Sequence, residues 1–203
     1  MSKLAFIFPG QGAQKAGMGK DFYENSEAAR SFFDQAQKIL DFDLKEMCFG
    51  EHEELNLTEY TQPCMVSVCL AIVQELKKRG INPDITAGLS LGEYAAVAAA
   101  GGMNELDAIK LVRRRGILMQ STVPAGEGAM AAVLGLDAKK IEEILESFEN
   151  VWIANYNCPG QIVITGLTNE VKQASLALKE AGAKRVVELK VSGPFHSLLL
   201  KPA

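Results

Sequence analysis

The chain has 203 residues, of which 48% are hydrophobic and 23% are charged, and its formal net charge at neutral pH is −4. This length allows one large or two small domains with proper cores, and the negative charge argues against a general nucleic-acid-binding protein. The N-terminal residues lack the pattern of a signal peptide and the alanine-rich run at 95–100 is too short to span a membrane, so we expect a cytoplasmic protein.

The predicted elements of the first 121 residues follow the order strand, helices, strand, helix, helix. A short apolar strand at 4–8 leads into a glycine-flanked loop at 9–14. Helices are predicted at 28–40 and 61–78, then a strand at 85–87 and two helices at 91–100 and 104–121. This order is typical of an α/β layer with a parallel sheet.

A different pattern follows a composition break at 124–128. It predicts a strand at 129–136, a helix at 138–148, strands at 151–155 and 161–166 joined by a turn at 157–160, a helix at 169–182 and a strand at 185–190. This βαββαβ order is the ferredoxin-like arrangement. We therefore expect an α/β protein in which residues 1–126 form the first part of a large domain, 127–191 an inserted ferredoxin-like subdomain, and 192–203 a return to the large domain.

Ser90 is the candidate nucleophile, because it lies between two glycines in Gly88-Leu89-Ser90-Leu91-Gly92, at the junction of a predicted strand and helix. Flanking glycines permit a sharp turn that exposes the hydroxyl at the positive end of a helix. The alternative is a tight turn without chemistry. A serine nucleophile needs a base, and of the two histidines His52 lies in an acidic, solvated segment, which leaves His196 in Gly193-Pro194-Phe195-His196.

Arg115 is the candidate anion-binding residue. It shares a predicted helix face with apolar residues at helical spacing, whereas Arg113 and Arg114 point elsewhere. That face is formed by Ala108, Leu111, Val112, Leu118 and Met119. An inward guanidinium needs an anion, which is either an internal Asp or Glu or a substrate carboxylate.

Gln11 lies in the loop after the first strand, where α/β proteins place their ligands. The loop lacks the pattern of a P-loop or a dinucleotide fingerprint, and the alternative is a plain turn. Its backbone N–H and that of Leu91 could form an oxyanion hole. The four cysteines, Cys48, Cys64, Cys69 and Cys158, show no metal-ligand or disulfide-framework spacing, so we expect reduced thiols and no metal.

Five segments together resemble the malonyl-CoA:acyl carrier protein transacylases and the related acyltransferase domains of fatty-acid and polyketide synthases. They are Phe8-Pro9-Gly10-Gln11-Gly12-Ala13-Gln14, Gly88-Leu89-Ser90-Leu91-Gly92-Glu93-Tyr94, the arginine before Gly116-Ile117-Leu118-Met119-Gln120, Asn155 to Gln161, and Gly193-Pro194-Phe195-His196-Ser197. They occur in family order and cover essentially the whole chain. The family fold is a large α/β-hydrolase-like domain with an inserted ferredoxin-like one, in agreement with the predicted elements.

The resemblance implies a ping-pong transfer of a malonyl group from CoA to the phosphopantetheine thiol of acyl carrier protein. Ser90 and His196 would be catalytic, the Gln11 and Leu91 amides would hold the oxyanion, and Arg115 would bind the malonyl carboxylate. The substrate pocket would include Met119, Asn155 and Phe195. A phenylalanine before the catalytic histidine, as at Phe195, is similar to the malonyl-selective members of the family. The resemblance implies no metal or redox cofactor, and we expect a monomer. Basic side chains at Lys184, Arg185 and Lys190 are candidates for docking the acidic carrier.

The chain differs from the family pattern in two places. It has Leu89 where many members have histidine, and it ends at Ala203. Family members continue past the catalytic histidine, so we expect a C-terminally truncated chain that lacks the group orienting His196, with low activity and reduced stability. A start at Met1 without a condensing domain favours a discrete type II enzyme. The alternatives are a serine hydrolase or thioesterase, which the inward Arg115 argues against, and an inactive, truncated carrier-protein-binding relic.

Overall fold

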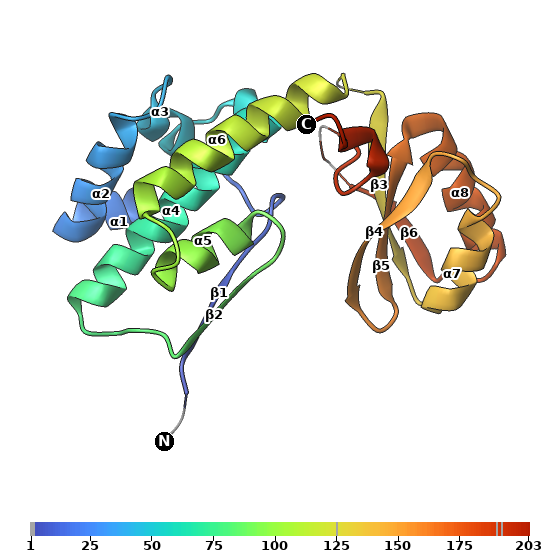
Figure 1. Ribbon diagram of the computed structural model, residues 1–203, viewed down its shortest axis with the longest axis horizontal. Coiled ribbons are helices and arrows are strands. Elements are labelled where there is room, and N and C mark those ends of the chain that lie inside the picture. The colour runs from blue at the N-terminus through green and yellow to red at the C-terminus, as the bar shows by residue number, and fades with distance from the viewer. Residues whose placement is uncertain (1–2, 125, 190, 192) are drawn as a thin grey trace. The chain divides into compact units, whose positions relative to one another are not determined.

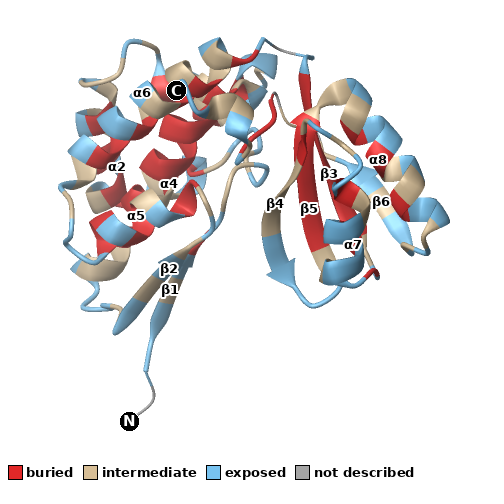
Figure 2. Cartoon of the chain, turned by 45° about the vertical axis from the view of Figure 1, so that its right-hand side comes forward, coloured by how far each residue is buried: buried red, intermediate tan, exposed pale blue. Residues whose placement is uncertain are grey.

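The computed structural model describes residues 3–124, 126–189, 191 and 193–203 of the chain. Two compact units can be distinguished within it, Met1–Ile117 and Leu118–Ala203. Each unit encloses buried apolar residues of its own, shown in red in Figure 2. Both are mixed α/β in their secondary structure (Figure 1).

The first unit contains a pair of strands and a set of helices. In chain order these elements are β1 (Ala5–Phe8), α1 (Lys20–Asn25), α2 (Glu27–Gln37), α3 (Leu44–Phe49), the 3-10 helix η1 (Glu53–Asn56), α4 (Thr58–Lys78), β2 (Ile85–Gly88), α5 (Gly92–Ala99) and the first part of α6 (Glu105–Thr122). Helix α4 lies at the centre of the core and packs against α2, α3 and α5. No helix in the described part of the chain is long and apolar enough to cross a membrane.

Strands β1 and β2 form a two-stranded parallel sheet, with Ala5 opposite Ile85 and Phe8 opposite Gly88. Helix α5 contacts both strands and covers one face, where Thr86 Oγ1 donates to the Ala96 carbonyl at 3.0 Å. Side chains alternate along the strands, so Ile7 and Ile85 point away from α5 and are 78% and 61% exposed. The carboxyl ends of both strands therefore meet at the same edge, beside the loops that follow Phe8 and Gly88.

The second unit has a four-stranded antiparallel sheet in the order β4-β5-β3-β6. Its elements are β3 (Gly128–Leu134), α7 (Ala138–Leu145), β4 (Val151–Cys158), β5 (Gln161–Leu167), α8 (Thr168–Glu180), β6 (Arg185–Glu188) and η2 (Leu198–Leu200), after the end of α6. The central strands β3 and β5 are buried, as Figure 2 shows. Buried side chains on α7 and α8, such as Ile141 and Leu178, complete the core.

The observed elements differ from the predicted ones at several ends. Helix α4 begins at Thr58 rather than at 61, although Pro63 lies inside it. Proline cannot donate a hydrogen bond to the Glu59 carbonyl four residues earlier, but this carbonyl accepts one from Arg113 Nη1 at 2.8 Å and so is not left unsatisfied. Strand β4 extends to Cys158, so the turn at 157–160 is in fact the shorter Pro159-Gly160.

Candidate functional site

Ser90 lies in the turn between β2 and α5 in a left-handed backbone conformation, with φ of 50°. Only Ser90 and His196, among the non-glycine residues that the structure describes, have positive φ. Such a conformation costs about 1–3 kcal/mol for a residue with a Cβ and is concentrated at functional sites. The structure therefore places backbone strain at the two residues that the sequence indicates as nucleophile and base.

The turn around Ser90 requires both of its flanking glycines. A Cβ at Gly88 would lie 2.1 Å from the Gly92 carbonyl carbon, and a Cβ at Gly92 would lie 2.3 Å from the Phe8 carbonyl oxygen. Backbone atoms cannot yield to such overlaps. The Gly-x-Ser-x-Gly pattern is thus needed for a tight strand-to-helix turn, as expected, and the turn packs directly on the end of β1.

Two backbone N–H groups beside this turn have no acceptor among the described residues, those of Gln11 and Leu91. Leu91 is the N-cap of α5, where the helix dipole favours negative charge. The Gln11 loop abuts the turn, because a Cβ at Gly10 would lie 2.9 Å from the Leu89 carbonyl oxygen. These two N–H groups can donate to an oxyanion.

Side-chain hydrogen bonds hold the Gln11 loop against the end of η1 and the start of α4. Gln11 Nε2 donates to Thr58 Oγ1 at 3.0 Å, and Gln14 Nε2 donates to Asn56 Oδ1 at 3.1 Å. Gln14 Oε1 in turn accepts from the Gly12 N–H at 2.7 Å. The loop is therefore fixed by its two glutamine side chains, a role for Gln14 and Thr58 that the sequence alone did not indicate.

Arg115 is half-buried on α6, and its guanidinium carbon lies 5.5 Å from the centre of the Tyr94 ring. No carboxylate among the described residues is within ion-pair distance of it. Burial lowers the pKa of Arg115, and Tyr94 partly opposes this shift. The sequence predicted either an internal Asp or Glu or a substrate carboxylate as the partner of this side chain. No Asp or Glu of the described part of the chain pairs with it. Leu111, predicted on the same inward face, is instead 45% exposed.

Arg113 contrasts with Arg115, although both lie on α6. It forms two hydrogen bonds with the Asp41 carboxylate, at 2.8 and 2.9 Å, and one with Glu59 Oε2 at 3.0 Å. Its guanidinium also lies over the rings of Phe42 and Tyr60. Burial tends to lower its pKa, but the two carboxylates raise the pKa of Arg113 on balance. Its ion pairs are thus structural.

In the second unit, His196 follows a buried segment. Pro194 packs on β3 so closely that a Cβ at Gly128 would lie 2.1 Å from Pro194 Cδ. Phe195 is 6% exposed and packs in a cluster with Met119, Met130, Ala132 and Val163, whereas His196 is exposed. Asn155 is half-buried on β4, opposite Val163.

The candidate site residues are divided between the two units. The first unit contains Ser90, Leu91, Gln11 and Arg115, and the second contains His196, Phe195, Met119 and Asn155. The structure brings together the serine turn and the Gln11 loop by contact. Tyr94, in the first turn of the helix that follows Ser90, contacts Arg115. Lys184 and Arg185 are exposed, and Lys190 lies outside the described residues. No group of three or more His, Cys, Asp and Glu side chains in the described part could hold a metal ion.

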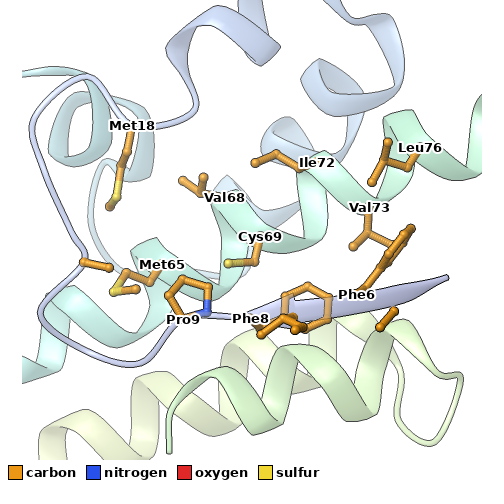
Figure 3. Close-up of a pocket in the computed structure, with 13 residues that line it drawn as sticks. Phe6, Phe8, Pro9, Met18, Met65, Val68, Cys69, Ile72, Val73 and Leu76 are labelled. Atoms are coloured by element: carbon orange, nitrogen blue, oxygen red, sulfur yellow. The ribbon is translucent and has the colours of Figure 1, made fainter. Parts of the chain in front are cut away.

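A separate apolar cavity of about 410 Å³ lies between β1 and α4 (Figure 3). Its walls include Phe6, Phe8, Met65, Cys69 and Ile72. Neither Ser90 nor Arg115 lines it. Its lining also includes Pro9 and Ala13, which belong to the loop that contains Gln11.

Comparison with known proteins decides the family. The sequence profile of the acyl transferase domain matches residues 5–203. The chain belongs to this family. It is 50% identical over 208 residues to a malonyl CoA-acyl carrier protein transacylase of Bacillus subtilis, covering 100% of this chain and 66% of that protein. The chain thus spans slightly less than two thirds of the length of this curated relative.

Solved structures of the family are also similar. A malonyl CoA-acyl carrier protein transacylase from Clostridium perfringens matches with a TM-score of 0.92 and 43% identity, over 99% of this chain and 65% of that one. A malonyl-transacylase in complex with a type II polyketide synthase acyl carrier protein matches with a TM-score of 0.94 and 41% identity, over 99% and 67%. These family members share the α/β fold described above.

Proposed function

We propose that this chain carries the acyl-transfer site of a malonyl-CoA:acyl carrier protein transacylase. The observation that supports this most is the pairing, within one unit, of a strained serine and a half-buried arginine that has no carboxylate partner among the described residues. A nucleophile for the thioester and a cation for the distal carboxylate are the two groups that a malonyl thioester needs. The names of the relatives agree with this substrate.

The proposed reaction has two half-reactions. His196 accepts the hydroxyl proton as Ser90 Oγ attacks the malonyl carbonyl carbon, and the Gln11 and Leu91 N–H groups stabilise the oxyanion. The C–S bond then breaks, CoA leaves as a thiol with the proton from His196, and malonyl-Ser90 remains. The phosphopantetheine thiol of a carrier protein attacks this ester in the reverse sense and restores the Ser90 hydroxyl. Arg115 binds the malonyl carboxylate throughout, and Met119, Asn155 and Phe195 line the pocket.

We also propose that the fold combines a ferredoxin-like subdomain with an α/β-hydrolase-like domain. The order β4-β5-β3-β6, all antiparallel, with α7 and α8 as connections, supports a ferredoxin-like subdomain at 127–191. The parallel β1–β2 pair, followed by the serine turn, supports an α/β-hydrolase-like domain formed by 1–126 and 192–203. We also propose a cytoplasmic monomer that acts without metal or redox cofactor, with acyl carrier protein as its partner.

A serine hydrolase is the competing enzyme class, since water could replace the carrier thiol. The test incubates the protein with malonyl-CoA and measures CoA release with and without phosphopantetheinylated acyl carrier protein. A transferase releases one equivalent of CoA per protein without the carrier, and continues to release it only when the carrier is added. Sustained release without the carrier identifies a hydrolase, and carrier binding without any CoA release identifies a non-catalytic module.

A further inference from the structure

Tyr94 is the side chain that holds Arg115 in the structure. The Arg115 guanidinium carbon is 5.5 Å from the centre of the Tyr94 ring, a distance within the range of a cation–π contact. No ion pair with any described carboxylate fixes this guanidinium, and hydrogen bonding with the Tyr94 hydroxyl opposes the lowering of the Arg115 pKa by burial. The orientation of Arg115 therefore depends on Tyr94 rather than on a carboxylate.

The place of Tyr94 in the fold links this ring to the nucleophile. It is four residues after Ser90, in the first turn of α5, and its N–H donates to the Leu91 carbonyl at 3.2 Å. Its half-buried side chain packs against the core of the first unit. Helix α6 is fixed from the other side, because a Cβ at Gly116 would lie 2.7 Å from the Thr58 carbonyl oxygen. Both ends of the contact are thus held by rigid elements.

We propose that Tyr94 is a positioning residue that presents the Arg115 guanidinium to the acyl carboxylate and thereby sets the preference for acyl groups that carry one. Neither the ring face nor the neutral phenol hydroxyl of Tyr94 neutralises the cation, so the guanidinium keeps its charge and most of its hydrogen-bond donors for substrate. A carboxylate in the same place would occupy those donors, as Asp41 and Glu59 do for Arg113. This role rests on the proposed function, in which Arg115 binds the malonyl carboxylate.

The test uses Tyr94→Leu, which removes the ring and the hydroxyl, and Tyr94→Phe, which keeps the ring and removes only the hydroxyl. The Arg115 Nε–Hε resonance, assigned by its loss in Arg115→Lys, reports the contact by NMR, because protons over a ring face are shifted upfield. We expect Tyr94→Phe to keep the wild-type shift and Tyr94→Leu to lose it. In single-turnover acylation of Ser90, Tyr94→Leu should weaken malonyl-CoA binding roughly 3- to 30-fold and leave acetyl-CoA binding unchanged.

Tyr60→Leu is the matched control, since the Tyr60 ring lies 5.0 Å from the Arg113 guanidinium carbon instead. It should leave both the Arg115 resonance and the malonyl preference unchanged. The proposal is overturned if Tyr94→Leu keeps the Arg115 shift, if Tyr94→Phe loses it, or if malonyl and acetyl binding weaken equally. If no protein, wild type included, forms acyl-Ser90, then the proposed function fails, whereas the NMR shifts still decide whether Tyr94 positions Arg115.

Discussion

At the scale of single residues, the left-handed backbone of Ser90 opposes stability. Replacing Ser90 with glycine relieves the steric cost of the Cβ, whereas alanine retains it. We expect Ser90→Gly to be about 1 kcal/mol more stable than Ser90→Ala in urea denaturation, even though glycine gains more conformational freedom on unfolding. Equal stability of the two variants, both of which lack the hydroxyl, would mean that the turn is not strained.

Arg115 provides a second test at this scale. Arg115→Gln removes the charge and the paired donors but keeps a polar side chain of similar length. Acylation of Ser90 by malonyl-CoA should fall about 10- to 100-fold, and acylation by acetyl-CoA should change little. Arg114→Gln, on the exposed side of α6, is the control and should behave as wild type. An equal loss with both acyl groups would assign Arg115 to the scaffold.

The Arg113–Asp41 pair predicts a pH dependence of stability. The hydrogen bond from Arg113 holds the pKa of Asp41 below its ordinary value. The unfolded state therefore binds the Asp41 proton more tightly, so the stabilisation is complete above the ordinary carboxyl pKa of about 3.9 and is lost as the pH falls through the lower folded pKa. Asp41 is 66% exposed, so its contribution should stay below about 1 kcal/mol.

The comparison is between wild type and Asp41→Asn in urea denaturation at about pH 6 and about pH 3. At about pH 6, wild type should be more stable than Asp41→Asn. The difference in unfolding free energy between the two proteins should be smaller at about pH 3. Glu143→Gln, an exposed carboxylate on α7, should show no such convergence. A constant gap between wild type and Asp41→Asn at both pH values would contradict the assignment.

At the scale of elements, the contact between α4 and α6 depends on Gly116. Glycine inside a helix normally costs about 1 kcal/mol relative to alanine. Here the sign should reverse, because a Cβ would lie 2.7 Å from the Thr58 carbonyl oxygen and 2.8 Å from Glu59 Cα. We expect Gly116→Ala to destabilise the protein by about 1–3 kcal/mol in urea denaturation, whereas Ser121→Ala on the exposed part of α6 should be nearly neutral. A stabilising Gly116→Ala would show that the helices can separate at no cost.

The sequence predicted the long elements well, because their apolar periodicity spans several turns or alternations. It predicted neither α1 nor α3, which have six residues each and offer too few periodic positions. It also missed the ion pairs of Arg113, since Asp41 and Glu59 are far from it in the chain. Helical spacing indicated that Arg115 faces inward. Whether an Asp or Glu side chain lies beside Arg115 depends on tertiary contacts, which the spacing of residues in the sequence does not encode.

At the scale of the whole molecule, the chain has two compact units with separate cores. Glycines and proline at 124–128 predict a break, whereas the contacts divide the chain at Ile117–Leu118, inside α6. A division within a helix leaves no glycine or proline signal, which is why composition alone could not indicate it. The proposed nucleophile, Ser90, lies in the first unit and the proposed base, His196, in the second.

The most direct test is the identification of the acylated residue. The protein is incubated with malonyl-CoA, and the mass of the intact protein and of its peptides is measured before and after addition of phosphopantetheinylated carrier protein. We expect one malonyl group on the peptide that contains Ser90, its absence in Ser90→Ala, a strong decrease in His196→Ala, and its removal by the carrier. Malonyl groups on another residue, or an adduct that persists in Ser90→Ala, would contradict the assignment of Ser90 as the nucleophile.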